Sequence, residues 1–319
     1  MPTSALAPYR SPEALASAVE RLAQPLGAER VEYGRSVAGA PLVALRVPGR
    51  RPGLPRVLCC ANIHGPELVS TEVALGLLQA LDDGGAAFLR DKAEVWVAPS
   101  LNPDGHRRTF ALAGDAPLAR LRPNDRGVDL NRNYPLPDGR ARRTFGLPGA
   151  GSTRPGDATY IGEHPLSEPE TAAIDALVLE QRFVASADLH SFMGTVIPAR
   201  VTDRRQYGAY RALCGAFFDA QPMKRYRRVA NRVVDVFTGE QEDHLHHNRQ
   251  CWSVCVETFP LFASYRQHWS APTTFWRFNP RQPKPWVDND VPGIAAFFAR
   301  AVALGRPPGD RANDDRAGS

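Results

Sequence analysis

The stretch Ala61-Asn62-Ile63-His64-Gly65-Pro66-Glu67 joins the apolar run Val57-Leu58-Cys59-Cys60 to an amphipathic segment that extends from Val69 to Leu81. This order predicts a buried strand, a tight turn and a helix. His64 and Glu67 lie three residues apart at the turn, so an imidazole and a carboxylate can face one point, as zinc binding requires. The stretch therefore predicts a strand–turn–helix unit that carries two metal ligands.

A third ligand has to come from a distant part of the chain. The segment Asp188-Leu189-His190-Ser191 ends another apolar run, and His190 is the candidate. Two histidines and one glutamate leave a fourth position for water, as in catalytic zinc sites. A His-x-x-Glu pattern alone is also common in surface turns, so the metal site depends on the motifs that follow.

Composition indicates a folded globular protein. The chain has 319 residues, of which 43% are hydrophobic and 23% charged, and its net charge is +5. The arginines are interspersed with acids, which argues against a nucleic-acid partner. No apolar run approaches the roughly 20 residues of a membrane span, and the first residues lack the features of a signal peptide. We therefore expect no membrane partner and a cytoplasmic location.

Hydrophobic periodicity predicts strands and helices that alternate along the chain. Strands are expected at residues 30–34, 41–47, 56–61, 93–99, 183–189, 194–198, 232–237 and 252–257. Helices are expected at residues 12–26, 66–81, 168–181, 204–220, 239–248 and 290–304, with a Ser167 cap before the third, and residues 99–167 and 272–285 are expected to be irregular. This order predicts an α/β fold, a single domain over residues 1–304 whose mixed central sheet is sandwiched by helices, followed by a disordered tail at 305–319.

Two groups of potentially reactive side chains are interpreted as structural. The five cysteines are an odd number and lie mostly in apolar runs, which favours buried, reduced thiols. The histidines at positions 244, 246 and 247 could form a second metal site, but a solvated helix face is the favoured interpretation.

Further motifs follow in a characteristic order: Asn102-Pro103-Asp104-Gly105, Asp129-Leu130-Asn131-Arg132-Asn133, Ser167-Glu168-Pro169-Glu170, Leu189-His190-Ser191 and the strand-borne Glu257. Together with His64-x-x-Glu67, they resemble the zinc metallocarboxypeptidases of the carboxypeptidase A/B type over roughly residues 30 to 300. The chain also resembles the short bacterial branch of this family, which includes murein-peptide amidases. The resemblance implies one Zn²⁺ per chain, held by His64, Glu67 and His190.

The same resemblance implies roles for five more residues. Glu257 would be the general base and then the general acid. Arg132 and Asn131 would bind the terminal carboxylate of the substrate, because a guanidinium offers a planar, permanently charged fork. Arg122 would stabilise the oxyanion of the transition state. Asp129 would accept a hydrogen bond from His64 and fix its tautomer without binding the metal.

The chain departs from the family in one region. The family has a mobile tyrosine about twenty residues before the base, whereas residues 233–239 contain none; Phe237 is the candidate to cover the site, without a hydroxyl. Glu242 and Asp243 stand where the family sets its side-chain pocket, which favours a cationic or zwitterionic side chain such as that of lysine, arginine or diaminopimelate. The resemblance also implies a cis peptide bond between Ser191 and Phe192.

Three functions remain open at this point. The favoured one is a zinc metallocarboxypeptidase whose partner is a peptide with a free C-terminal carboxylate, with small or cell-wall-derived peptides as candidate substrates. The second is an N-acyl-amino-acid amidohydrolase of the aspartoacylase or succinylglutamate desuccinylase type. The third is a catalytically silent module that binds C-terminal tails or polyanions. The motifs at residues 102–105 and 167–170 favour the first.

Overall fold

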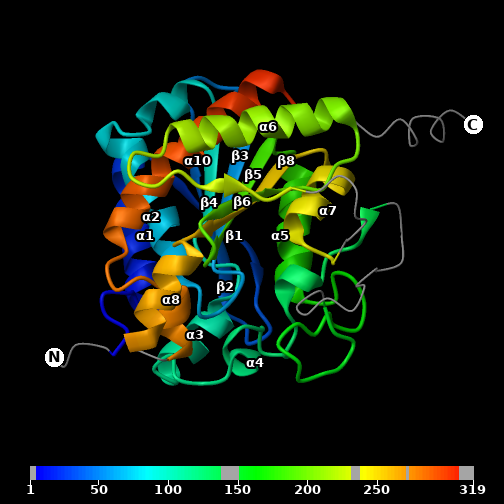
Figure 1. Cartoon of the computed structure of the whole chain (residues 1–319). Coiled ribbons are helices and arrows are strands. Elements are labelled where there is room, and N and C mark those ends of the chain that lie inside the picture. Colours follow the sequence, from blue (N-terminus) through cyan, green and yellow to red (C-terminus); the bar gives the residue numbers. More distant parts are fainter. Residues whose placement is uncertain (1–4, 138–150, 231–237, 271–272, 309–319) are drawn as a thin grey trace, which may run out of the picture.

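A mixed β-sheet forms the middle layer of the protein. The computed structural model describes residues 5–137, 151–230, 238–270 and 273–308. Within these ranges the sheet has eight strands in the order β1-β2-β4-β3-β5-β8-β6-β7, and helices cover both of its faces (Figure 1). The predicted α/β fold with a mixed, helix-flanked sheet is confirmed.

Four parallel strands form the centre of the sheet, and antiparallel neighbours extend it on both sides. The central strands are β4 (Glu94–Ala98), β3 (Arg56–Ala61), β5 (Ala185–Ser191) and β8 (Trp252–Thr258). The outer strands are β1 (Glu29–Arg35), β2 (Pro41–Val47), β6 (Thr195–Pro198) and β7 (Arg227–Arg228). The carboxyl ends of the parallel strands thus lie at one edge, where ligand sites of open α/β sheets usually form.

Strand β3 explains why both faces of the sheet are covered. Val57, Cys59 and Ala61 pack into one hydrophobic core, whereas Leu58 and Cys60 pack into a second core on the opposite face. Successive side chains of a strand point to opposite faces, so a continuous apolar run needs apolar partners on both sides.

Two sets of helices provide these partners. The larger core includes side chains of α1 (Pro12–Leu26), α2 (Leu68–Asp83), α6 (Arg204–Asp219) and α10 (Lys284–Leu304). The smaller core includes side chains of α5 (Pro169–Gln181) and α7 (Gln241–Arg249). None of the helices in the described ranges combines the length and apolar character that crossing a bilayer requires.

The prediction of irregular structure at residues 99–167 is wrong in part. This region contains α3 (Pro103–Ala111), α4 (Leu118–Leu121) and the short 3₁₀ helix η2 (Leu130–Arg132). Helix α3 begins with a clear signal, because the Asn102 side chain accepts a hydrogen bond from the Gly105 amide at 2.8 Å and Pro103 occupies the first turn. The Asn102 side chain also donates to the Ile63 carbonyl at 3.2 Å, so the start of this helix is tied to the turn after β3.

The segment predicted to be irregular at residues 272–285 is more regular from residue 273 on. It contains α9 (Thr274–Phe278), and α10 begins at Lys284, earlier than the expected residue 290. Helix α8 (Leu261–Ser270) lies in a stretch for which neither a helix nor a strand was predicted. The remaining short helix of the described ranges is η1 (Ala87–Asp91). Asn279 holds the end of α9 close to the turn after β3, since its side chain donates to the Pro66 carbonyl at 2.6 Å and accepts from the Val69 amide at 2.8 Å.

The start of α5 differs from the predicted Ser167 cap. The N-cap residue is Glu168, which makes no side-chain capping bond, and Ser167 donates to its carboxylate at 2.8 Å instead. Glu168 and Glu170 both accept hydrogen bonds from the Asn124 amide, at 2.7 and 3.1 Å. Glu170 also accepts a hydrogen bond from the Val37 backbone amide at 3.0 Å. The two glutamates therefore link the segment around Asn124 to the turn between β1 and β2.

The predictions for the cysteines and for the histidines of α7 have opposite outcomes. All five cysteines are free and buried, as predicted. The solvated face predicted for the histidines of α7 is wrong, because His244 and His246 are buried. His244 Nε2 lies 2.7 Å from an Asp175 oxygen, and His246 Nδ1 accepts from the Tyr210 hydroxyl at 2.9 Å. These contacts attach α7 to α5 and α6. The strand predicted at 232–237 lies outside the described residues.

The close approach of α2 and α10 yields a prediction about stability. A Cβ at Gly76 of α2 would lie 2.2 Å from Val287 Cγ1, whereas a Cβ at Gly208 of α6 would meet nothing within 4 Å. We expect Gly76→Ala to lower the free energy of unfolding by about 1–3 kcal/mol through overpacking. The matched control Gly208→Ala should raise it by about 0.5–1 kcal/mol through helix propensity. Denaturant unfolding of both variants measures the difference, and equal effects would contradict this account of the α2–α10 contact.

Candidate active site

The candidate site lies at the carboxyl ends of three neighbouring parallel strands. His64 and Glu67 follow β3, while His190 is near the end of β5 and is in register with Glu257 on β8. Residues in register on adjacent strands point to the same face, so His190 and Glu257 are brought together by the sheet itself. The expected cis peptide bond between Ser191 and Phe192 is present.

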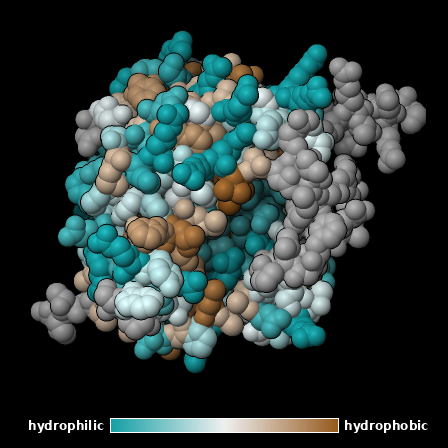
Figure 2. Space-filling view, in the orientation of Figure 1, coloured by the Kyte–Doolittle hydropathy of each residue, from teal (hydrophilic) through white to brown (hydrophobic). Residues whose placement is uncertain are grey.

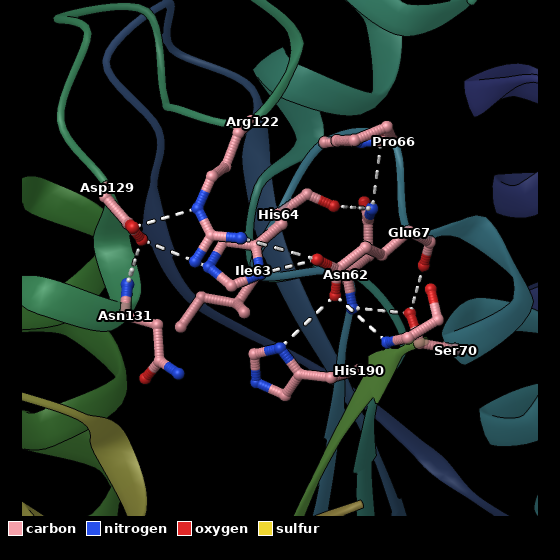
Figure 3. Close-up of polar contacts among 12 residues, drawn as sticks. Asn62, Ile63, His64, Pro66, Glu67, Ser70, Arg122, Asp129, Asn131 and His190 are labelled. Carbon is pink, nitrogen blue, oxygen red and sulfur yellow. Dashed lines mark hydrogen bonds and ion pairs between the residues drawn. The ribbon is translucent and has the colours of Figure 1, made fainter. Parts of the chain in front are cut away.

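The three predicted metal ligands converge on one point (Figure 3). Glu67 Oε1 lies 2.9 Å from His64 Nδ1, and Glu67 Oε2 lies 3.2 Å from His190 Nδ1. The ligand atoms of all three residues lie within 4.8 Å of one another, and each residue is 2% exposed. The Glu67 carboxylate thus lies between the two imidazoles, in a site that is largely buried.

A carboxylate lies behind each imidazole. His64 Nε2 is 3.1 Å from Asp129 Oδ1, and His190 Nε2 is 2.9 Å from Asp188 Oδ2. An acceptor at Nε2 favours the tautomer that carries its proton there, which leaves the Nδ1 lone pair for a metal. The Asp129 contact is the one that the resemblance implied. Asp188 was missed, although its position two residues before His190 on a strand places both side chains on one face.

The electrostatics of the site favour a cation between the ligands. Burial opposes ionisation of Glu67, but the charges and hydrogen bonds of His64 and His190 outweigh it and lower the pKa of Glu67 well below its usual range. Burial would lower the pKa of His190, yet Asp188 and Glu67 raise it well above the ordinary value. Three buried carboxylates surround the two imidazoles, and Arg122 supplies one positive charge beside them, so a proton or a metal ion at the imidazoles would balance the remaining negative charge.

The donor set suits zinc. Two imidazole nitrogens and one carboxylate are the protein ligands of many catalytic zinc sites, in which water takes the fourth position. The orienting carboxylates at Asp129 and Asp188 complete the arrangement expected around such a metal. The residues present therefore fit a Zn²⁺ ion.

Glu257 faces this group from β8. Its side chain lies with His190 and Cys255 in a second cluster whose potential ligand atoms are all within 4.8 Å of one another. Glu257 Oε2 is buried and has no hydrogen-bond partner in the part of the chain that the structure describes. Burial raises the pKa of Glu257 to about 7. A carboxylate oxygen thus stands beside the metal ligands with its lone pairs unused.

Arg122 lies against the same ligands. Its Nε donates to Asp129 Oδ2 at 2.9 Å, and its Nη1 is 3.6 Å from Glu67 Oε1 (Figure 3). The Arg122 carbonyl accepts from the Gly65 amide at 3.2 Å, which fixes this part of the backbone beside the metal-binding turn. The Arg122 guanidinium therefore lies next to the candidate metal ligands. This position is compatible with the predicted role of Arg122, which is to stabilise the oxyanion of the transition state.

Asn131 and Arg132 lie next to one another in η2 and both contact the start of α7. Asn131 Oδ1 accepts from the Gln241 amide at 2.8 Å. Arg132 Nη1 forms an ion pair with Glu240 Oε1 at 3.3 Å, and the Arg132 side chain is 13% exposed. Glu240 was not predicted as a site residue, because nothing in its spacing links it to a residue more than a hundred positions away.

A cavity of about 280 Å³ adjoins these residues between β6, α6 and the first turn of α7. Glu240, Glu242 and Asp243 line it. The predicted pocket residue Glu242 is 3% exposed, and its Oε2 has no hydrogen-bond partner within the described ranges. Asp243 Oδ1 instead accepts from the Arg200 amide at 2.6 Å. The other predicted pocket residue, Phe237, lies outside the described residues.

The face of the molecule that carries α7 and α8 is hollowed. Figure 2 shows that the floor of this hollow is mostly hydrophilic, in contrast to the brown apolar side chains on its rim. In the same orientation, α8 and α7 lie on opposite sides of the central strands (Figure 1). This face of the protein therefore carries a polar depression.

The chain is similar in sequence to known carboxypeptidases. The chain is 33% identical over 176 residues to carboxypeptidase E of Caenorhabditis elegans, a match that covers 50% of this chain and 36% of that protein. It is 31% identical over 224 residues to carboxypeptidase D of Mus musculus, covering 59% of this chain and 14% of that protein. The chain thus spans well under half the length of these curated relatives.

Solved structures show the same fold. The structure of bovine thrombin-activatable fibrinolysis inhibitor in complex with tick carboxypeptidase inhibitor matches with a TM-score of 0.73 and 18% identity, over 93% of this chain and 98% of that one.

A model of the family described as zinc carboxypeptidase matches residues 18–257, which include every predicted metal ligand and Glu257. The chain belongs to the zinc carboxypeptidase family.

Proposed function

We propose that the protein is a zinc-dependent metallocarboxypeptidase that hydrolyses the C-terminal peptide bond of a substrate with a free α-carboxylate. The observation that carries this proposal is the convergence of His64, Glu67 and His190 with a buried, unpartnered Glu257 oxygen beside them. A binding module without catalysis needs no spare carboxylate at that position. Burying one costs free energy unless a partner arrives, and substrate and water are the natural partners.

His64, Glu67 and His190 would hold the zinc ion, one per chain, and Asp129 and Asp188 would orient the two imidazoles. When bound, zinc polarises the scissile carbonyl and makes a water molecule more acidic. Glu257 accepts the proton of the attacking water at its free oxygen and returns it to the leaving nitrogen. Its place in register with His190 keeps this oxygen beside the metal ligands.

Two arginines divide the recognition of negative charge. Arg122, which lies against Glu67 and Asp129, stabilises the oxyanion that develops on the carbonyl oxygen. Arg132, with Asn131 beside it, binds the α-carboxylate of the C-terminal residue. Separate sites for the two charges restrict hydrolysis to the last peptide bond of the substrate.

Small peptides, including those derived from cell walls, are the proposed substrates. The chain has no tyrosine in residues 233–239, where the family resemblance leads one to expect a tyrosine that closes over the substrate. The face that carries α7 and α8 is also hollowed, and the floor of the hollow is mostly hydrophilic (Figure 2). Both features suit a short substrate whose terminal residue is recognised mainly by its charges.

A substrate panel tests the proposed function. The zinc-loaded protein is incubated with N-blocked dipeptides, cell-wall peptide fragments and N-acyl amino acids, and release of the C-terminal residue is followed by mass spectrometry. We expect peptides with a free C-terminus to be hydrolysed and the same peptides with an amidated C-terminus to remain intact. Turnover of N-acyl amino acids alone would replace the proposal with the amidohydrolase alternative, and binding without turnover would favour the silent module.

The role of Glu257 gives a quantitative prediction. Glu257→Gln keeps the shape of the side chain but removes its ability to accept a proton, so kcat should fall by at least about two orders of magnitude. Zinc content, measured by elemental analysis, should stay at one ion per chain because Glu257 is not a proposed ligand. Glu180→Gln, at an exposed position on α5, is the matched control. Equal rates in wild type and Glu257→Gln would remove Glu257 from the mechanism.

The carboxylate behind His64 gives a prediction for metal affinity. Asp129→Asn should weaken zinc binding by about 10–100-fold, because an amide orients and polarises the imidazole less well than a carboxylate. Competition with a chromophoric chelator measures the affinity, and Asp219→Asn, an exposed carboxylate on α6, serves as the control. Circular dichroism monitors folding, since Asp129 also binds Arg122. An unchanged zinc affinity would contradict the orienting role.

A further inference from the structure

Helix α8 exposes large apolar and aromatic side chains to solvent. The exposed fractions are 53, 76, 61 and 79% for Leu261, Phe262, Tyr265 and Trp269. At 3.6 residues per turn these four side chains occupy one face of the helix, about 100° wide. A surface helix normally buries such a face against the core of its own protein. The outer face of α8, defined by these four residues, is instead directed away from the core.

The opposite face of α8 is polar and is fastened to the protein. Ser264 Oγ donates to the Arg277 carbonyl of α9. Gln267 Nε2 donates to the carbonyls of Trp276 and Asn279, at 2.7 Å each. The helix therefore cannot rotate its apolar residues inward without breaking these hydrogen bonds. Its orientation is the reverse of that of an ordinary amphipathic surface helix, so an external apolar partner is expected for the outer face.

The segment that contains α8 carries positive but no negative charge. Residues 259–287 include neither aspartate nor glutamate, and their cationic residues are Arg266, Arg277, Arg281 and Lys284. Lys284 pairs with Asp288, just beyond this segment. The three arginines have no carboxylate partner in the part of the chain that the structure describes. A partner of the outer face therefore meets an excess of positive charge.

The positive charge borders the apolar residues directly. Arg266 is exposed and lies one helical turn from both Phe262 and Trp269. Its long side chain can lie along an apolar surface while the guanidinium stays at the polar boundary. Apolar burial and charge pairing can thus occur in one contact.

The outer face lies close to the candidate active site. Helix α8 begins four residues after Glu257, and Phe192, which follows the cis peptide bond, packs against Phe278 of α9 with ring centroids 5.0 Å apart. The Arg277 guanidinium lies 5.4 Å from the centre of the Phe192 ring. Helix α8 is on the face of the molecule that is hollowed (Figures 1 and 2). A partner of α8 therefore binds on the same side as the hollow.

We propose that the outer face of α8 docks the protein on the surface of a lipid bilayer that contains anionic headgroups. The apolar side chains enter the boundary between headgroups and acyl chains, where tryptophan and tyrosine are favoured. Arg266, together with Arg277 and Arg281, pairs with the headgroups. The expectation of no membrane partner considered only segments that span a bilayer, and a peripheral contact needs none. The docking requires neither zinc nor the hydrolytic residues.

The charges favour a bilayer over a second copy of the chain. In a symmetric dimer formed through α8, the same face of both molecules would meet, and the arginines of one would approach those of the other. Like charges placed opposite one another oppose such an association. An anionic bilayer covers the apolar side chains and compensates the arginines at the same time.

Vesicle binding tests the proposal. The full chain is mixed with vesicles of phosphatidylcholine alone or of equal parts of phosphatidylcholine and phosphatidylglycerol, and the bound fraction is measured by sedimentation. We expect the partition constant to be at least about tenfold higher on the anionic vesicles, because several cations meet the headgroups. Added salt should weaken this binding, since it screens the charges.

Variants separate the apolar from the ionic contribution. The double variant Phe262→Ser and Trp269→Ser should lower the partition constant on anionic vesicles by at least about tenfold, because two large side chains no longer leave water. Arg266→Gln should lower it by about fivefold on anionic vesicles and leave binding to neutral vesicles unchanged. Leu179→Ser on α5 and Arg211→Gln on α6, both at exposed positions, are the matched controls and should bind as wild type does.

Fluorescence tests whether α8 itself enters the bilayer. Anionic vesicles with brominated acyl chains quench a tryptophan that reaches the chains, so the fluorescence of the wild type should fall on binding. Trp269→Phe keeps an apolar side chain and should still bind, but most of the quenching should disappear. Equal quenching in both proteins would place another part of the chain at the bilayer and overturn the proposal.

The proposed hydrolytic activity is tested separately. Zinc-free protein and Glu257→Gln should bind vesicles as the wild type does. A protein that binds vesicles but hydrolyses no peptide would contradict the proposed function alone. A protein that hydrolyses peptides but does not bind anionic vesicles would contradict the docking alone.

Three further results would overturn the docking. Equal vesicle binding by the wild type and the double variant would show that charge alone attracts the protein. A wild-type dimer in light scattering that the double variant converts to a monomer, without vesicle binding, would assign the outer face to a second copy. Unchanged vesicle binding together with a raised KM for long peptides in the double variant would assign the face to the substrate.

Discussion

The carboxylate of Glu67, held between the Nδ1 atoms of His64 and His190, is the contact on which the rest of the site depends. It joins the turn after β3 to the end of β5, and its Oε2 also accepts from the Ser191 amide at 3.2 Å. Every other charged group is placed relative to it. Asp129 and Asp188 set the imidazoles from behind, Arg122 approaches from the side, and Glu257 stands on the neighbouring strand.

The sheet determines how accurately these groups can be held. Two of the four central residues, His190 and Glu257, occupy strands that are hydrogen-bonded to each other in register. The other two lie in a turn that is tied to the rest by backbone and amide contacts, including those of Asn279 with Pro66 and Val69. Rigid elements position catalytic groups more precisely than loops do. Asn131, Arg132 and Glu240, in contrast, lie in η2 and at the start of α7, outside the sheet.

Local patterns in the sequence were sufficient for the centre of the fold and for the pair His64 and Glu67, whereas the roles of Glu257, Arg122 and Asp129 were inferred from the family resemblance. The apolar run before His64 predicted β3, and its burial on both faces follows from alternation in the pleat. Helix α3 was missed because the apolar periodicity is weak there, although Asn102 and Pro103 form a clear helix start.

Contacts between distant residues were the part that sequence reasoning could not reach. The Glu240–Arg132 pair and the burial of His244 against Asp175 depend on where α7 packs, and no spacing rule encodes that position. The histidines of α7 were assigned to solvent on their polarity. Polar side chains turn inward when buried partners satisfy them, and Asp175, Tyr210 and Gln206 do so here. Asp188 is a different case, because its position two residues before His190 on a strand could have been recognised from the sequence.

The inward-facing histidines of α7 have a consequence for how the protein can diversify. They fasten one side of the helix to α5 and α6, while the acids of its first turn border the cavity on the other side. The hydrolytic groups belong to different segments, namely the turn after β3 and the ends of β5 and β8. The side chains at positions 240 and 242 can therefore change in the course of evolution without moving the residues at the strand ends, because α7 is held in place from its opposite side.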